Sequence, residues 1–156
     1  MGTGIKKLPI KVFEEIYRQV PRLCVEVIID TPKGIILAKR LVPACIGMWH
    51  IPGGTVYHGE RLEEAVHRIA DDELGVEIDI KNMIGVIEYP RICEKKSSHA
   101  IGIAFLCKLK SEEQEFRGSF QAREIKAFKT IPDNTVPEQK TFLDRLDKER
   151  SVYNYV

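Results

Sequence analysis

The sequence predicts a single domain of mixed α/β class, on three observations. The chain has 156 residues, which is the usual length of one domain with its own core. Segments rich in β-branched residues alternate with amphipathic segments of helical period, a pattern typical of a mixed sheet covered by helices. No repeat, low-complexity tract or linker divides the chain, so we expect residues 1–156 to form one domain.

The first elements are predicted to be a helix and a β-hairpin. The helix begins at Pro9, a residue favoured in the first turn, and its apolar residues recur at helical spacing as far as Val20. The runs LCVEVIID and GIILAKR have the composition of strands. Between them, TPK and Gly34 favour a tight turn.

The later elements are predicted in the same way from composition and period. In chain order we expect a short strand at Trp49 and Ile51, a helix over 61–74 closed by Gly75, long strands in IDIKNMIGVIEY and HAIGIAFLCKL, a final strand in EIKAFKTI and a closing helix in PEQKTFLDRLDKER. The polar segments PRICEKKSS and SEEQEFRGSFQ are expected to be loops.

Charge and hydropathy exclude several classes of partner. The net charge is +1, from 24 basic and 23 acidic residues, so the balance does not favour nucleic acid or a membrane surface. No apolar run reaches the length of a membrane span, and the N-terminus has no apolar core of a signal peptide. We therefore expect a cytoplasmic protein that acts on a small molecule.

The cysteines give no indication of a metal or redox site. Cys24, Cys45, Cys93 and Cys107 lie far apart, and no two of them form a C-x-x-C pair. We expect reduced cysteines that are mostly buried as small apolar residues.

An acid lies where the predicted helix 61–74 should be apolar. On a helical wheel Glu73 falls in the middle of the face that carries Val66 and Ile69, and Asp72 lies at its edge. A buried, unpaired carboxylate costs several kcal/mol, so Glu73 would require an arginine, backbone N–H groups or a cation. Alternatively, the last helical turn frays and the acids are solvated.

The segment around this helix resembles the signature of the Nudix hydrolases. The matching residues at the family spacing are Gly54, Glu60, Arg68, Ala70, Glu73, Gly75 and Val76. The resemblance implies a Nudix fold, a mixed β-sheet between helices, in which residues 61–74 form the catalytic helix. It also implies a site for Mg²⁺, or Mn²⁺, formed by the Gly53 carbonyl and the Glu73 carboxylate with support from Asp72. Glu60 and Glu64 are expected to pair with Arg68 and to hold the loop and helix together.

Two residues depart from the signature. A glutamate of the family is Ile69 here, and the first acid of its Glu-Glu pair is the shorter Asp72. We expect positions 69, 72 and 73 to share one helix face, so these changes should leave one strong metal site.

A similar loss marks the GDP-mannose mannosyl hydrolases, and the resemblance to that branch runs from about Phe13 to about Leu143. It is carried by PRLCVEVIIDTPKGIILAKR and GMWHIPGG. This implies a homodimer in which water attacks the anomeric carbon of a nucleotide sugar and releases GDP and the free hexose. Arg40 matches an arginine that assists the leaving phosphate, and Gln121 matches a metal-contacting glutamine.

The roles of three other residues remain open from the sequence. Glu26 matches an acid near the sugar in that branch, but it is equally an outward-facing strand residue. Tyr89 is a candidate to stack on a nucleobase, although strand aromatics more often belong to the core. His50 replaces an apolar strand residue and is expected to be structural.

The general base is the main departure from the branch. Its histidine is Ala122 here, and an arginine after the two glycines is Thr55. The base is then Glu124, or His99, which matches a histidine of the branch, or the chemistry differs. Three functions follow: hydrolysis at the sugar carbon, hydrolysis at phosphorus with Glu124 or another loop acid as the base, or a non-catalytic domain that senses a nucleotide.

Overall fold

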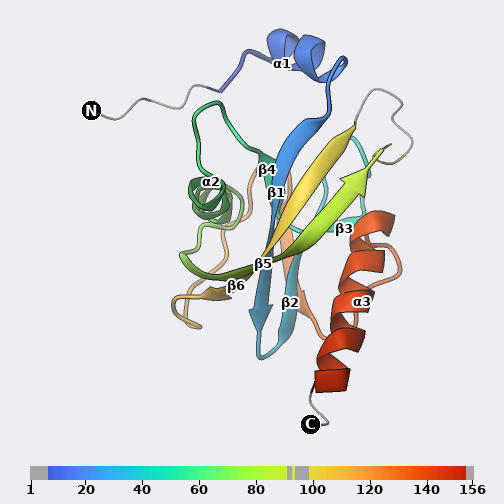
Figure 1. Ribbon diagram of the computed structural model, residues 1–156. Helices are drawn as coiled ribbons and strands as arrows, with labels where there is room; N and C mark the ends of the chain where they lie inside the picture. The colour runs from blue at the N-terminus through green and yellow to red at the C-terminus, as the bar shows by residue number, and fades with distance from the viewer. Residues whose placement is uncertain (1–6, 91–92, 94–98, 154–156) are drawn as a thin grey trace.

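The computed structural model describes residues 7–90, 93 and 99–153. Within these residues the elements follow the predicted order (Figure 1). They are α1 Ile10–Tyr17, β1 Arg22–Thr31, β2 Gly34–Lys39, β3 Trp49–His50, β4 Gly53–Thr55, α2 Leu62–Ile69, the π-helix η1 Ala70–Leu74, β5 Ile78–Tyr89, β6 Ala100–Leu109, β7 Glu124–Phe128 and α3 Pro137–Tyr153. The predicted mixed α/β class is confirmed. The loop PRICEKKSS, apart from Pro90 and Cys93, lies outside the described residues.

The strands form one mixed sheet of seven. Its main path is β3-β2-β1-β6-β5, with β4 paired to β1 and β7 paired to β2. β1 runs parallel to β6, and the other pairings are antiparallel. The central position of β1 explains its nearly continuous apolar run, because a central strand is covered on both faces.

The two faces of β1 belong to two different cores. The odd-numbered residues 25–29 pack with α2, whereas Cys24 and Ile28 pack on the opposite face with Phe142 of α3. Figure 1 shows α2 and α3 on opposite sides of the strands. Because strand side chains alternate, Glu26 belongs to the face that α3 covers.

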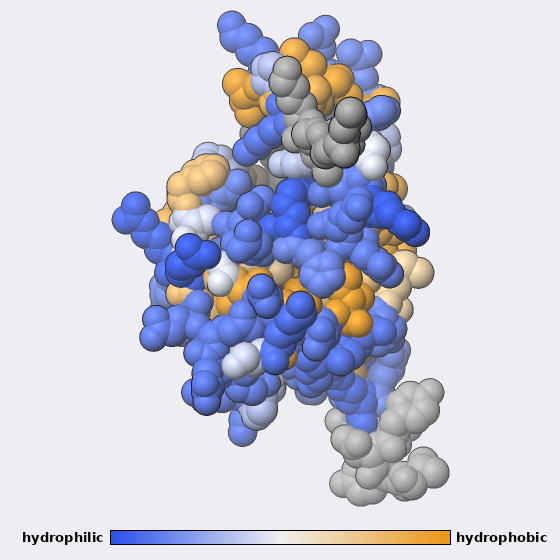
Figure 2. Space-filling model, turned by 90° about the vertical axis from the view of Figure 1, so that its left-hand side faces the viewer, coloured by the Kyte–Doolittle hydropathy of each residue, from blue (hydrophilic) through white to orange (hydrophobic). Residues whose placement is uncertain are grey.

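The hairpin of β1 and β2 and the helix α1 differ in how closely they pack against the rest of the domain. Gly34 ends the turn with φ +120°, and a Cβ there would collide with the backbone of Phe128, so the position requires glycine. By contrast, α1 has no buried residue, and Ile10 is 69% exposed. Figure 2 shows hydrophobic residues at the top of the molecule over α1, above a face that is mainly hydrophilic around α2.

The predicted catalytic helix forms, but its last turn is a π-helix. Residues 62–69 are α-helical, η1 follows, and Gly75 closes the segment in the left-handed region with φ 66°. A π-turn contains more residues than an α-turn, so the side chains after Ala70 point in other directions than a regular α-helical wheel predicts. The prediction that positions 69, 72 and 73 share one face is therefore wrong. Ile69 is buried in the core, and the side chain of Asp72 is 61% exposed.

Candidate active site

The loop before α2 is held by a partly buried ion pair between Arg68 and Glu60, as the sequence predicts. Arg68 Nε donates to Glu60 Oε1 at 2.6 Å and Arg68 Nη2 donates to Oε2 at 2.9 Å, which is a two-pronged pairing. Arg68 also donates to the Thr55 carbonyl, and Glu60 accepts the Tyr57 amide. The expected pairing of Glu64 with Arg68 is wrong, because the Glu64 carboxylate instead accepts the Arg61 amide and caps the helix.

This loop borders a small cavity of about 170 Å³ at the ends of β1, β2, β3 and β4. Side chains that can hydrogen-bond or carry charge line much of it. These are Arg22, Glu26, Arg40, His50, Tyr89 and Gln139. Gly53 and Gly54 complete the wall beside the loop. The structure thus brings together Arg40, Glu26, Gly53 and Tyr89 from the predicted site.

Glu26 lies in a cradle formed by two glycines. A Cβ at Gly102 would lie 2.5 Å from Glu26 Oε1, and a Cβ at Gly53 would overlap Glu26 Oε2. Glu26 is 5% exposed and lines the cavity. Of the two positions that the sequence left open, the structure therefore shows the inward one. Burial raises the pKa of Glu26 to about 8, and the hydrogen bond from Tyr89 opposes that shift.

A chain of hydrogen bonds connects α3 to Glu26. The Ile51 amide donates to Gln139 Oε1 at 2.7 Å, Gln139 Nε2 donates to the Tyr89 hydroxyl at 2.9 Å, and that hydroxyl donates to Glu26 Oε1 at 2.9 Å. Tyr89 is 3% exposed and packs in the core on the α3 side, which agrees with the core role rather than the stacking role of the two that the sequence left open. Its hydroxyl instead holds the Glu26 carboxyl in place.

Glu73 is the acid of the helix that points back to the glycine loop. Burial raises the pKa of Glu73 to about 7, while the positive charge of Arg40 and a hydrogen bond from the Gly53 backbone oppose the shift. Arg40 itself donates to the carbonyls of Ala44, at 2.6 Å from Nε, and Pro43, at 3.1 Å from Nη2. Glu73 is therefore not solvated by fraying of the helix, because an arginine and backbone atoms surround it.

The donor set fits a cation that is shared with a substrate. Among the described residues no group of three or more His, Cys, Asp or Glu side chains could enclose a metal ion. Glu73 supplies one carboxylate beside the cavity, next to Arg40, and accepts a hydrogen bond from the backbone N–H of Gly53, which lines the cavity wall. Magnesium in proteins is commonly bound by one or two carboxylates, with water and substrate phosphates completing its shell. These residues fit that mode.

His50 lies on the cavity wall and not simply in the core. It is buried, and its Nδ1 lies 2.6 Å from the Ala38 carbonyl. Burial, with the charge of Arg40, lowers the pKa of His50 to about 4. The sequence predicted a structural role for His50, because a single histidine within a strand does not belong to any functional motif.

Besides Glu73, which lies next to the cavity wall at Gly53 and Arg40, four predicted site residues do not line the cavity. Asp72 faces Arg68 at 3.7 Å and solvent, and it acts on Glu73 only through its charge, which raises the pKa of Glu73. His99 is exposed at the start of β6. Glu124 is paired with Lys39 and Lys126 on β7, and the hydrogen bond from Lys126 lowers its pKa. Gln121 lies beside the end of β2, where its carbonyl accepts the Leu41 amide, but its side chain does not line the cavity.

One cysteine prediction is also wrong. Cys45 and Cys93 form a disulfide that links the segment after β2 to the segment after β5, which are 48 residues apart in sequence. Cys24 and Cys107 are free and buried, as expected. Spacing alone could not identify the pair, since the two residues meet only in the folded chain.

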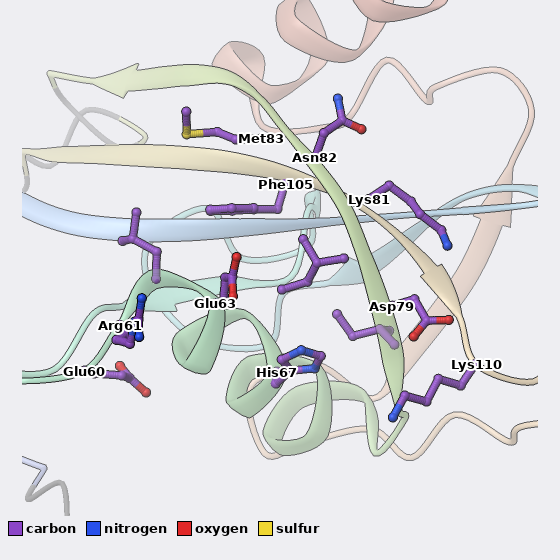
Figure 3. Close-up of a pocket in the computed structure, with 13 residues that line it drawn as sticks. Glu60, Arg61, Glu63, His67, Asp79, Lys81, Asn82, Met83, Phe105 and Lys110 are labelled. Atoms are coloured by element: carbon purple, nitrogen blue, oxygen red, sulfur yellow. The ribbon is translucent and has the colours of Figure 1, made fainter.

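A second, larger hollow of about 980 Å³ lies between α2 and β5 (Figure 3). Glu63 and His67 face it from α2, and Asp79 and Lys110 face it from the strand side. Glu63 and His67 are exposed, and this hollow is open to solvent. Arg40, Glu26 and Gly53 line the smaller cavity and not this hollow, so more of the predicted site residues gather at the smaller cavity.

Comparison with known sequences agrees with this architecture. The family model described as the NUDIX domain matches residues 20–146. The low-salt glycan biosynthesis protein Agl8 of Haloferax volcanii is 30% identical over 145 residues, which span 90% of this chain and 92% of that protein. An ADP-ribose pyrophosphatase of Methanocaldococcus jannaschii is 35% identical over 86 residues, 55% of this chain and 50% of that protein.

Comparison with solved structures gives the same fold. The MutT Nudix hydrolase from Burkholderia pseudomallei superposes with a TM-score of 0.71 at 23% identity, covering 82% of this chain and 99% of that one. A Nudix hydrolase from Nitrosomonas europaea gives a TM-score of 0.70 at 20% identity, covering 85% and 73%. None of the helices in the described ranges is long and apolar enough to cross a membrane. The fold, the signature residues between Gly54 and Val76 and the family match over residues 20–146 together establish that this chain belongs to the Nudix family.

Proposed function

We propose that this protein hydrolyses a nucleoside diphosphate sugar, with a divalent cation, by directing water at the anomeric carbon of the sugar. The observation that carries the proposal is the position of Glu73 and Arg40. Glu73 lies beside Arg40, which lines a small cavity where the Glu26, His50, Tyr89 and Gln139 side chains are held by hydrogen bonds. An acid for a cation, an arginine for phosphate and a pocket for a polar ring match the parts of such a substrate.

The charged part of the substrate is assigned to the edge of the cavity. Glu73 and the Gly53 carbonyl would hold Mg²⁺ or Mn²⁺, which supplies positive charge for a departing diphosphate. Arg40 is presented by two backbone carbonyls and lines the same cavity. A guanidinium is suited to phosphate because its N–H groups pair with two oxygens at once.

The sugar is assigned to the interior of the cavity. Its volume of about 170 Å³ is well below the roughly 300–1,000 Å³ of sites for drug-sized ligands, so a single small ring suits it better than a nucleobase with its sugar. The Glu26 carboxyl and the Gln139 amide are polar groups of the type that bind sugar hydroxyls. The nucleoside would then remain outside the cavity.

The acids of the helix favour attack at carbon over attack at phosphorus. On the helix, position 69 is the buried Ile69, and the side chain of Asp72 faces Arg68 and solvent, so Glu73 is the acid of the helix best placed to bind a cation. One cation is sufficient to stabilise a leaving diphosphate. GDP-mannose, which the resemblance implies, is the first substrate to test.

A second candidate is hydrolysis at a phosphorus of a nucleoside diphosphate derivative. It is favoured by the relative from Methanocaldococcus jannaschii, an ADP-ribose pyrophosphatase that is 35% identical over 86 residues. The two candidates release different products. Attack at the sugar gives a nucleoside diphosphate and a free hexose, whereas attack between the phosphates gives a nucleoside monophosphate and a hexose 1-phosphate.

The test is product analysis by phosphorus NMR with purified protein, GDP-mannose and Mg²⁺. We expect GDP and free hexose from the wild type and neither product from E73Q. GMP with hexose 1-phosphate would overturn attack at carbon and favour the second candidate. Intact substrate across a panel of nucleotide sugars, combined with ligand binding that survives E73Q, would favour a nucleotide sensor instead.

The homodimer implied by the resemblance is part of the same proposal. The helix α1 buries none of its residues within the described chain and exposes Ile10, Val12 and Ile16. This apolar face would contact a second copy of the chain in the dimer. Light scattering should give the mass of a dimer for the wild type and a lower average mass when these three residues are changed to serine.

A further inference from the structure

Within the proposed function, on which this inference rests, the chain lacks an assigned general base. Ala122 is buried and carries no basic group, His99 is exposed at the start of β6, and Glu124 is engaged by two lysines. A base must lie within hydrogen-bond reach of the attacking water, so it should be sought among the residues that line the cavity.

We propose that His50 is the general base, taking the proton of the attacking water on its Nε2 atom. The tautomer of the neutral ring follows from one contact. A carbonyl oxygen can only accept a hydrogen bond, so Nδ1, which lies 2.6 Å from the Ala38 oxygen, carries the proton. Nε2 then holds the free lone pair, and the ring lines the cavity.

The other titratable groups of the cavity are already engaged or are poor bases. Arg22 and Arg40 are cations. Glu26 accepts the Tyr89 hydroxyl on one oxygen, and burial raises the pKa of its carboxyl to about 8, so most of it is protonated at neutral pH. Burial raises the pKa of Tyr89 and of Cys24, so both keep their protons at neutral pH. His50 is left as the neutral group with an unused acceptor.

The step balances with the groups present. The oxygen of water forms a bond to the anomeric carbon while the bond from that carbon to the diphosphate oxygen breaks. The nucleoside diphosphate leaves with the bonding electron pair, beside Arg40. The water proton passes to His50 Nε2 and afterwards to solvent. The low pKa of His50 keeps the ring neutral at neutral pH, so Nε2 is unprotonated, although it also makes the ring a weaker base than a free histidine.

The test separates the two nitrogens of the ring. In H50N the amide nitrogen occupies the place of Nδ1 and still donates to the Ala38 carbonyl, but no basic atom replaces Nε2. We expect kcat for release of GDP and hexose to fall about 10²- to 10⁴-fold, with KM and the melting temperature little changed. H67N, the same substitution at an exposed position of α2, is the matched control and should keep the wild-type rate.

Each outcome bears on a different statement. A wild-type kcat in H50N overturns the inference while leaving the proposed function intact. A fall in kcat together with an equal loss of affinity for GDP, measured by calorimetry, also overturns it, because His50 would then only shape the cavity. If H50N does not fold, H50Q is assessed by the same rule. Failure of the wild type to release free hexose overturns the proposed function and the inference with it.

Discussion

The two hollows of the molecule differ more in the surroundings of their charged groups than in the groups themselves. The hollow between α2 and β5 is much the larger and is lined by exposed side chains such as Glu63 and His67. In the cavity beside β1, Glu26, His50 and Tyr89 are buried, and each has a hydrogen-bond partner that fixes its position. Burial and fixed partners, rather than volume, distinguish a site prepared for chemistry from a solvated depression.

The largest difference between the two hollows should be in catalysis. E73Q keeps the size of the side chain but removes the charge that would hold the cation, so we expect turnover to fall by about 10³-fold. The companion variant E63Q makes the same change in the open hollow and should stay within about twofold of the wild type. Steady-state rates at saturating Mg²⁺ provide the measurement. Equal losses of turnover in E73Q and E63Q would contradict the assignment of catalysis to the smaller cavity rather than to the open hollow.

The acid dependence of stability should also distinguish the two hollows. Because the pKa of His50 is lowered from 6.5 to about 4, the unfolded chain binds more protons than the folded chain between these pH values. The contribution of His50 to the free energy of unfolding should therefore fall by about 3 kcal/mol as the pH is lowered from about 6.5 toward 4. Glu26 and Glu73, whose pKa values are raised, contribute with the opposite sign, equally in the wild type and in a His50 variant.

Urea unfolding of the wild type and H50F at several pH values measures that contribution. The charged group that acts on His50 is Arg40, which both proteins retain. H50F should lose less stability on acidification, whereas H67F, altered in the open hollow, should follow the wild type. Parallel curves for the wild type and H50F would contradict a buried, neutral histidine.

The tight packing around Glu26 predicts a smaller effect on stability. In G102A the added Cβ would lie 2.5 Å from Glu26 Oε1, so the carboxyl must move, at a cost of about 2 kcal/mol. The shorter side chain of E26D should relieve part of this cost. A double-mutant cycle by thermal unfolding should give a favourable coupling between the two changes, and simple additivity would argue against the cradle.

The smallest effect is expected for further changes in the open hollow. Lys110 lies there beside Glu77 at 4.0 Å, an exposed pair of the type that contributes little. K110Q should change the free energy of unfolding by less than about 0.5 kcal/mol and leave catalysis unchanged. A marked loss of activity in K110Q would show that substrate extends into this hollow.

Much of the fold and part of the site could be predicted because they depend on local pattern. The spacing of Gly54, Glu60 and Glu73 reflects the geometry of one loop and one helix, and the predicted elements follow from hydrophobic period. The position of Asp72 could not be predicted from a regular wheel, because the π-turn of η1 changes the direction of the residues beyond Ala70.

The parts that the sequence could not provide depend on distant segments that meet only in the folded chain. Gln139 binds the Ile51 amide across 88 residues and holds Tyr89, which lies 63 residues from its partner Glu26. His50 and the Cys45–Cys93 bond depend on contacts of the same kind. No local pattern connects these positions, so the cavity became visible only from the topology of the sheet.

The most direct test of attack at carbon is to follow the oxygen of the attacking water. GDP-mannose is incubated with the wild-type protein and Mg²⁺ in ¹⁸O-labelled water, and both products are analysed by mass spectrometry with the hexose reduced at once to prevent exchange. We predict that the label appears in the hexose and that GDP remains unlabelled. Label in a phosphate of the nucleotide would place the attack at phosphorus and contradict this account.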